Sequence, residues 1–260
     1  MLIIIKGAGD LASGIACSLI RAGHQVVLTE ISRPTVVRRT VSFALAVEQG
    51  STKVEDIEGR LTDSPEQALA LAKQGIAAVL VDPETTCLKV LKPEVLVDAV
   101  IAKYNAGTHK EDAPLVIGIG PGFVAGKDCD AVIESQRGPH LGEVLWSGSA
   151  EPDSGVPGDI MGYTAERIIR APETGEFTPL AAIGDLVVKG QPVGRVGDQV
   201  VTAQLSGIVR GMLAVGTPVT KGLKSGDIDP RGQLQLCYHI SDKALAIGQA
   251  VLKAMATLGG

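Results

Sequence analysis

Residues 2–12 read LIIIKGAGDLA, and this stretch decides how the chain begins to fold. A short apolar segment runs into the pattern G-x-G-x-x-A, formed by Gly7, Gly9 and Ala12. In strand–turn–helix units of this kind, the first glycine allows a tight turn and the second lets the backbone approach a pyrophosphate. The N–H groups that open the helix then face the anion. We therefore predict a strand at 2–6, a phosphate-binding turn, and a helix at 11–22.

An acidic residue follows at the distance that a dinucleotide site requires. Residues 25–29 are expected to form a second strand, and Glu30 ends it, 21 residues after Gly9. An acidic side chain at this place accepts hydrogen bonds from an adenosine ribose. The candidate cofactor-binding residues of this region are Gly7, Gly9, Asp10, Leu11, Ala12 and Glu30.

Asp10 is unusual at such a turn, because its carboxylate would repel a pyrophosphate. One interpretation is that Asp10 caps the helix. The alternatives are that the turn is adapted to a different ligand, or that it binds a metal ion through Asp10. No residue of the chain is assigned to a metal site.

Apolar segments and helical patterns alternate along the first part of the chain. Ser64-Pro65 is a strong helix start, because serine is a good N-cap and proline suits the first helical position. Strands that are apolar throughout and alternate with helices predict a parallel sheet with helices on both faces. We predict an α/β fold with a Rossmann-like nucleotide-binding domain at 1–145. Its further strands are expected at 77–81 and 115–119, and its further helices at 34–49, 65–73 and 92–104.

A second group of polar residues follows the strand at 115–119. The turn Gly118–Gly122 lies where open α/β sheets bind their ligands. Gly120, Gly122, Arg137 and His140 are therefore added to the candidate binding residues, since arginine suits phosphate recognition. The acidic residues nearby could share in binding or acid–base work, but turns also collect aspartate and glycine for conformational reasons; these residues are Asp128, Asp130 and Glu134.

Residues 146–240 are β-rich and contain an internal repeat. The pattern [IV]-G-x-x-V-x-K-G-x-x-x-G-x-[IV] occurs at 183–196 and again at 215–228. A repeat this short must pack against its copy. The region 183–228 is similar to biotinyl and lipoyl domains, which implies a barrel-sandwich-hybrid-like fold. The hairpin at 197–199 lacks the lysine that such carriers modify, so a docking or structural barrel is expected instead of a swinging-arm carrier.

The end of this β-rich region carries the motif GDIDPRG at 226–232. The favoured interpretation is a turn that leaves the barrel with an internal Asp–Arg pair, and an anion clamp is the alternative. A helix at 241–258, with Ser241 as its N-cap, is expected to pack back on the body of the protein.

Composition excludes several classes of function. The net charge of −5 argues against nucleic-acid binding, which needs a surplus of Lys and Arg. The longest apolar run, Ile76–Val81, is far shorter than a membrane span, which needs about 20 residues. The four scattered cysteines do not form a disulfide or zinc pattern. We expect a cytoplasmic protein that binds neither nucleic acid nor membranes.

Several longer stretches resemble the YqeB family of selenium-dependent molybdenum hydroxylase system proteins, and they follow one another in order along nearly the whole chain. They are GAGDLASGIA (7–16), VVRRTVSFALAVEQG (36–50), GIGPGFVAGKDCDAVIESQRGPHLG (118–142), GSAEPDSGVPG (148–158) and GDIDPRGQLQLCYHISDKALAIG (226–248).

The resemblance implies an accessory role in the maturation of molybdenum hydroxylases. The implied partners are the hydroxylase apoprotein or other maturation factors, together with a small nucleotide-containing ligand; a homo-oligomer is a further option. The candidate cofactors are molybdopterin cytosine dinucleotide and NAD(P). Two alternatives stay open: an NAD(P)-dependent oxidoreductase that uses Glu30, and a non-catalytic docking scaffold with a vestigial Rossmann site. The sequence does not decide whether the protein is an enzyme.

Overall fold

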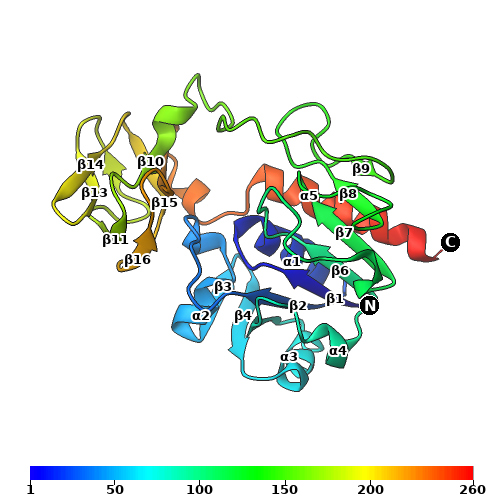
Figure 1. Cartoon of the computed structure of the whole chain (residues 1–260). Coiled ribbons are helices and arrows are strands. Elements are labelled where there is room, and N and C mark those ends of the chain that lie inside the picture. Colours follow the sequence, from blue (N-terminus) through cyan, green and yellow to red (C-terminus); the bar gives the residue numbers. More distant parts are fainter. Residues whose placement is uncertain (260) are drawn as a thin grey trace. The chain divides into compact units, whose positions relative to one another are not determined.

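The computed structural model describes residues 1–259 and divides them into two compact units (Figure 1). The first unit contains Met1–Pro34, Ser42–Ser154 and the C-terminal segment from Ile240. The second contains Thr35–Val41 and Gly155–His239. The first unit thus continues past residue 145, where its boundary was expected, and it includes the C-terminal helix. The chain also makes an early excursion into the second unit at Thr35–Val41.

A mixed sheet with nine strands in the described residues forms the centre of the first unit, in the order β3-β4-β5-β2-β1-β6-β7-β8-β9. From β4 to β8 every neighbouring pair is parallel, and each edge carries one antiparallel pair. The strands are β1 (Leu2–Lys6), β2 (Gln25–Glu30), β3 (Ser51–Val54), β4 (Ile57–Thr62), β5 (Ala77–Val81), β6 (Val95–Asp98), β7 (Leu115–Ile119), β8 (Ala131–Ile133) and β9 (Val144–Leu145).

Helices cover both faces of this sheet. Figure 1 shows α1 and α5 on one face and α3 and α4 on the other. On the second face, Ile4, Val27 and Leu96 of the strands pack with Ala68 and Ala72 of α3 in one apolar core. The helices are α1 (Asp10–Arg21), α2 (Leu45–Gln49), α3 (Pro65–Ala72), α4 (Leu88–Leu91) and α5 (Asp242–Met255).

Both helix starts that were predicted from serine caps are confirmed. The Ser64 hydroxyl accepts a hydrogen bond from the backbone N–H of Gln67 at 3.3 Å, and α3 begins at Pro65. The Ser241 hydroxyl accepts from the N–H of Ala244 at 3.1 Å, and α5 begins at Asp242. No helix within residues 1–259 combines the length and the apolar character that crossing a membrane requires.

The helix predicted at 92–104 is wrong. Residues Val95–Asp98 instead form β6, a fully buried strand between β1 and β7. Pro93 had suggested a helix start, but Lys92 before it has φ +45°, a left-handed conformation that ends α4. The apolar run that follows is rich in valine and is buried on both faces of the sheet, an environment that favours a strand.

The helix predicted at 34–49 is also wrong for most of its length. Only Leu45–Gln49 is α-helical, and a short 3₁₀ turn covers Arg39–Val41. Val37 packs on the core of the second unit, and its carbonyl accepts a hydrogen bond from Met212 N at 2.8 Å. Phe43 and Ala46, in contrast, are buried in the first unit. The apolar residues of 34–49 therefore belong to the cores of two different units.

The β-rich second part that was predicted is confirmed as two four-stranded sheets in the described residues. Their orders are β10-β17-β15-β12 and β14-β13-β11-β16. The first repeat supplies β12 and β13, and the second supplies β16 and β17, so each copy contributes one strand to each sheet. The strands are β10 (Ile168–Arg170), β11 (Gly175–Pro179), β12 (Leu186–Val187), β13 (Pro192–Val196), β14 (Gln199–Thr202), β15 (Gly207–Met212), β16 (Thr217–Val219) and β17 (Lys224–Asp229).

One apolar core joins the two sheets of the second unit. Phe177 and Val193 come from one sheet, and Val209 and Ile228 from the other; all four are fully buried. The hairpin expected near 197–199 joins β13 to β14, with Val196 paired to Gln199. The repeat therefore builds a shared core, as its short length required.

Candidate functional site

The turn between β1 and α1 has the backbone geometry that its glycines predict. Gly7 has φ +97°, and its N–H donates to the carbonyl oxygen of Thr29 at 2.9 Å. A Cβ atom added at Gly7 would lie 3.2 Å from the carbonyl oxygen of Ala99, so the chain after β6 approaches this turn closely. Both the conformation and the space favour glycine at this position.

The first turn of α1 presents backbone N–H groups. Gly9 is the N-cap and supplies no side chain, and the helical hydrogen-bond pattern starts with Ser13 N donating to Gly9 O at 2.8 Å. The first N–H groups of a helix have no acceptor inside the helix, so acceptors outside it must supply their hydrogen bonds. Leu11 and Ala12 lie in this first turn, and Ala12 is fully buried.

Asp10 is the first residue of α1 and not its N-cap, so the interpretation that Asp10 caps the helix is wrong. Its position still favours the helix, because a carboxylate in the first turn interacts well with the positive end of the helix dipole.

Ala8 is the point at which the turn is held in place. Its carbonyl oxygen accepts hydrogen bonds from Ser13 Oγ at 3.1 Å, Ser42 Oγ at 2.7 Å and Ala44 N at 2.9 Å. Ser13 and Ser42 are fully buried, and Ser13 Oγ also accepts from Phe43 N at 2.8 Å. Sequence reasoning missed both serines, because no local pattern indicates that two residues so far apart in the sequence meet at one carbonyl.

Glu30 closes the turn from β2. Its Oε2 accepts a hydrogen bond from Ala8 N at 2.9 Å, and its Oε1 accepts from Ile31 N at 2.8 Å. Burial raises the pKa of the Glu30 carboxyl above its ordinary value, and the hydrogen bonds from Ile31 and Ala8 oppose this shift. A carboxylate oxygen can accept more than one hydrogen bond, so both oxygens keep capacity for hydroxyl groups of a ligand.

The second glycine turn lies at the same edge of the sheet, after β7. Gly120 has φ +76°, and a Cβ added there would come within 2.5 Å of Ser135 Oγ. Gly122 has φ +111°, and a Cβ added there would come within 2.6 Å of Tyr104 N. Close packing and backbone conformation therefore explain these two glycines.

Arg137 and His140 contact carboxylates of the first unit. Arg137 donates from both terminal nitrogens to the two carboxylate oxygens of Asp242, each at 2.7 Å, and thus joins the loop after β8 to the start of α5. His140 Nδ1 lies 2.8 Å from Glu143 Oε2. Through Asp242, Arg137 is tied to the beginning of α5, the helix that packs against α1.

The neighbouring acidic residues accept backbone hydrogen bonds. Asp128 Oδ2 accepts from Val124 N at 2.8 Å, and Asp130 Oδ2 accepts from Val116 N at 2.9 Å. Glu134 accepts from the N–H groups of Gln136 and Glu151. These contacts support the conformational interpretation of the acidic residues in this region.

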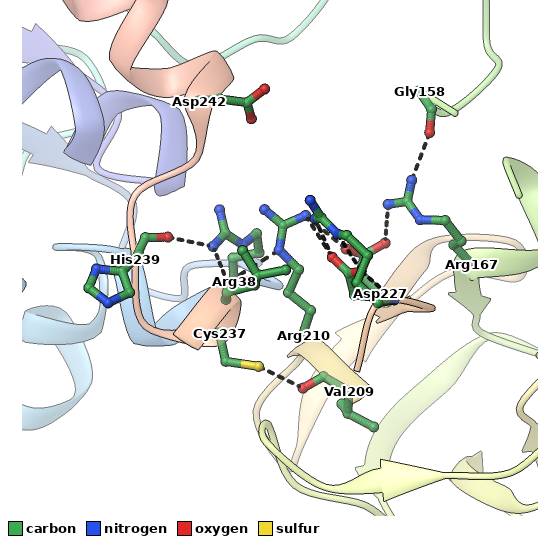
Figure 2. Close-up of polar contacts among 12 residues, drawn as sticks. Arg38, Gly158, Arg167, Val209, Arg210, Asp227, Cys237, His239 and Asp242 are labelled. Carbon is green, nitrogen blue, oxygen red and sulfur yellow. Dashed lines mark hydrogen bonds and ion pairs between the residues drawn. The ribbon is translucent and has the colours of Figure 1, made fainter. Parts of the chain in front are cut away.

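A buried cluster of arginine and aspartate lies in the second unit (Figure 2). Asp227 Oδ1 accepts from Arg167 Nη2 at 2.8 Å, and Arg210 Nη1 lies 3.9 Å from Asp227 Oδ2. Asp229 accepts from Arg231 Nε at 2.9 Å and Arg231 Nη2 at 2.6 Å. The Asp–Arg pair predicted in the motif at 226–232 is therefore confirmed.

The charges of this cluster shift one another's titration. Burial would raise the pKa of Asp229, but the hydrogen bonds and charge of Arg231 and the charge of Arg210 lower it. Burial and the nearby charge of Arg38 lower the pKa of Arg210, against the effect of Asp227 and Asp229. Arg38 donates to the carbonyl oxygen of Leu236 at 3.1 Å. It also donates to the carbonyl oxygen of His239 at 3.0 Å (Figure 2). Sequence reasoning did not anticipate Arg38, Arg167 or Arg210 here.

Comparison with known proteins gives a relative that carries the name YqeB. The chain is 48% identical over 257 residues to a protein named uncharacterized protein YqeB from Escherichia coli (strain K12). The alignment covers 99% of this chain and 48% of that protein, so the chain spans about half the length of this relative. No protein-family model matches the chain.

Solved structures give only distant likenesses. A succinylglutamatedesuccinylase/aspartoacylase from Rhodobacter sphaeroides has 15% identity and a TM-score of 0.28, covering 87% of this chain and 84% of that one. The ectoine utilization protein EutE (DoeB) from Ruegeria pomeroyi has 10% identity and a TM-score of 0.26, covering 87% and 85%. At these TM-scores neither likeness carries an argument about this chain.

Proposed function

We propose that the first unit is a Rossmann-like domain that binds a nucleotide-containing ligand at the turn Gly7–Ala12. The pyrophosphate would lie at the first turn of α1, and Glu30 would accept hydrogen bonds from the ribose hydroxyls. The strand order supports this: numbered in chain order, the six strands β1, β2, β5, β6, β7 and β8 lie in the order 3-2-1-4-5-6 and are parallel. Dinucleotide-binding folds with this order hold their ligand at the carboxyl ends of the strands.

The observation that carries this proposal is the hydrogen bond from Ala8 N to Glu30 Oε2 at 2.9 Å. This hydrogen bond holds Glu30, which we expect to bind the ribose, against the glycine turn, which we expect to bind the phosphates. Both halves of a nucleotide would therefore meet groups that are already oriented, which reduces the cost of ordering the site on binding.

The related family suggests which nucleotide-containing ligand this is. We propose that the protein is an accessory factor in the maturation of selenium-dependent molybdenum hydroxylases and that its ligand is the molybdopterin dinucleotide cofactor. The dinucleotide's pyrophosphate matches the first turn of α1. The hydroxylase apoprotein would be the macromolecular partner, and the second unit, which we interpret as barrel-sandwich-hybrid-like, would be a docking module.

An NAD-dependent oxidoreductase is the second candidate. The Glu30 carboxylate favours it, because an acidic residue at this position binds the 2′-hydroxyl of NAD and repels the 2′-phosphate of NADP. The third candidate is a docking scaffold whose nucleotide site is vestigial.

Ligand-induced stabilisation distinguishes the three candidates. Purified protein is heated with NAD, NADP, CTP, ATP or molybdopterin cytosine dinucleotide, each at a concentration series. A ligand at 100 times its Kd adds about 2.7 kcal/mol to the free energy of unfolding, which is readily measured. Selective stabilisation by the molybdopterin compound supports the accessory role, and stabilisation by NAD alone supports the oxidoreductase. No stabilisation by any of them contradicts the nucleotide site and leaves the scaffold.

Substitution of Gly9 tests where the ligand binds. Gly9 has φ −65°, so its backbone accepts a side chain, and both aspartate and serine are good N-caps. Gly9→Asp places a negative charge where the pyrophosphate is expected and should weaken nucleotide binding at least tenfold (~1.4 kcal/mol). Gly9→Ser is the matched neutral control and should retain more of the affinity. Equal affinity of the two variants, measured by calorimetry, would place the ligand elsewhere.

The pH dependence of binding tests the role of Glu30. Hydroxyl donors favour the ionised carboxylate, so a bound ribose lowers the raised pKa of Glu30. Affinity should therefore increase as the pH rises from about 4.5 through that raised pKa, and level off above it. Glu30→Gln should remove this dependence and weaken binding about tenfold at neutral pH, since hydrogen bonds to charged groups contribute ~1.5 kcal/mol or more. Inorganic pyrophosphate, which lacks ribose, is the control: at neutral pH its affinity should not decrease in Glu30→Gln.

A further inference from the structure

A cavity of about 300 Å³, with both charged and apolar side chains in its wall, lies in the first unit, on the face of the sheet that carries α3 and α4. This volume is at the lower end of the range for small-molecule sites. Its lining comes from β1 and β6, from α4 and the loop before it, and from the segment after β6; the residues used below are Lys6, Glu84, Thr85, Lys89, Thr108 and Asp112. None of these residues belongs to the turn at Gly7–Ala12.

The cavity lies at a change of direction in the sheet topology. β1 and β6 are neighbours, and the chain leaves β1 toward β2 on one side and β6 toward β7 on the other. Lys6, the last residue of β1, is paired in register with Asp98, the last residue of β6. Open α/β sheets bind ligands outside the carboxyl ends of their strands at such a switch point.

A buried ammonium group forms part of the cavity wall. Lys6 is 7% exposed, and its Nζ donates to Ala106 O at 2.8 Å and to Thr108 Oγ1 at 3.3 Å. Asp98 is 2% exposed; its Oδ2 accepts from Thr108 Oγ1 at 2.6 Å and lies 3.8 Å from Lys6 Nζ. These contacts hold the lysine at one position beside the cavity, so a ligand meets an oriented positive charge.

Thr85 carries two unfavourable features beside this lysine. It is 5% exposed, and its hydroxyl has no hydrogen-bond partner among the residues that the structure describes. It also has φ +54°, a conformation that a β-branched residue rarely adopts. Unpaired buried hydroxyls are uncommon and call for an explanation, and strained residues cluster at ligand sites. A change of χ1 rotamer moves the hydroxyl to another of its three staggered positions, so a ligand in the cavity can become the missing partner.

From these observations we propose that the cavity binds the oxyanion group, carboxylate or phosphate, of a small hydroxylated molecule. Lys6 and Lys89 supply positive charge, and Thr85 supplies a hydroxyl donor. Glu84 and Asp112 are acceptors in the same lining and suit the hydroxyl groups of the ligand. This site is separate from the proposed nucleotide site, because Lys6 lies on the face of the sheet opposite to α1.

The test measures binding of inorganic phosphate, glycerate and glycerol to the full chain by calorimetry. The background variant is Gly9→Asp, so that an oxyanion at the first turn of α1 does not contribute to the heat. We expect phosphate or glycerate to bind with one site per chain and glycerol not to bind. Phosphate alone would identify a phosphate-bearing ligand, and glycerate alone a carboxylate. Absence of binding by both oxyanions, or equal binding of glycerol, overturns the proposal.

Comparing oxyanion binding by Thr85→Val and by the control variant Thr29→Val shows whether the oxyanion binds in the cavity. Thr29 is 1% exposed, has an equally unpaired hydroxyl among the described residues, and is not part of the cavity lining. Both substitutions remove an unpaired buried hydroxyl, so both variants should keep or raise the melting temperature. Only Thr85→Val should weaken oxyanion binding, by about tenfold. Equal oxyanion affinities of the two variants overturn the proposal. The comparison is made in the Gly9→Asp background, so its result does not depend on whether the nucleotide site exists.

Discussion

Replacing Asp227 by asparagine is expected to destabilise the second unit by about 3–5 kcal/mol, the usual cost of removing one partner from a buried ion pair. Asp227 is 2% exposed and faces two buried guanidinium groups, those of Arg167 and Arg210. Asparagine keeps the shape of the side chain but removes the charge that compensates them. The loss therefore comes from uncompensated buried charge and not from a cavity.

Hydrogen exchange followed by mass spectrometry is the suitable measurement, because it assigns the loss to one unit. Amides of β15 and β17 should exchange roughly 10²- to 10³-fold faster in Asp227→Asn, since each 1.4 kcal/mol corresponds to a factor of ten. Asp198→Asn makes the same chemical change at an exposed hairpin residue of the same unit and should leave these rates nearly unchanged.

A second variant separates the charge effect from general damage to β17. Asp227→Leu combined with Arg167→Met replaces the more deeply buried ion pair, in which the two atoms lie 2.8 Å apart, by apolar side chains. Such a change is often neutral or stabilising in other proteins. The double variant should recover most of the protection that Asp227→Asn loses. If it exchanges as fast as the single variant, the ion pair is not the cause.

The parts of the fold that were predicted correctly depend on short-range signals. β1, β2, β5 and β7 are short apolar segments, and the caps at Ser64 and Ser241 fix the beginnings of two helices. Each of these signals is complete within a few residues, so sequence alone is enough to interpret it.

The wrong predictions share one physical cause, which is that partners distant in sequence decided the structure. The run Val95–Asp98 becomes a strand because β1 and β7 lie on its two sides, and no residue within 92–104 reveals these neighbours. In the same way, Val37 packs against Gly211 of β15, which has no side chain to fill the space. Tertiary packing overrode the local helical spacing at both places.

In the candidate site, too, the features set by a local motif could be predicted, and those set by distant partners could not. The conformations of Gly7 and of Glu30 beside it follow from a motif that spans one strand–turn–helix unit. The serines that hold Ala8 lie 30 or so residues apart, and Arg137 contacts Asp242 at the other end of the first unit's sequence. Polar residues acquire roles from partners that lie far away in the sequence, so a list of candidates by residue type could not identify Asp242 as a partner of Arg137.

Replacing Gly14 by alanine should destabilise the first unit by about 2–3 kcal/mol, although the same change in an exposed helix stabilises by roughly 1 kcal/mol. The reason is the close approach of α1 and α5. A Cβ atom added at Gly14 would lie 2.5 Å from Ala244 Cβ and 2.9 Å from Ile240 Cγ2. Ala244 Cβ cannot rotate away, because it is bonded directly to the backbone of α5, so the two helices would have to separate.

A double-mutant cycle shows that this contact is the cause. Ala244→Gly alone should cost about 1 kcal/mol in helix propensity, and in the double variant it removes the atom that the new methyl group would strike. The double variant should therefore lose less unfolding free energy, measured in urea, than the sum of the losses of the two single variants. Additive losses would show that Gly14→Ala acts within α1 itself. Because α1 begins at the proposed phosphate-binding turn, Gly14→Ala should also weaken nucleotide binding, and Ala244→Gly should restore it in the double variant.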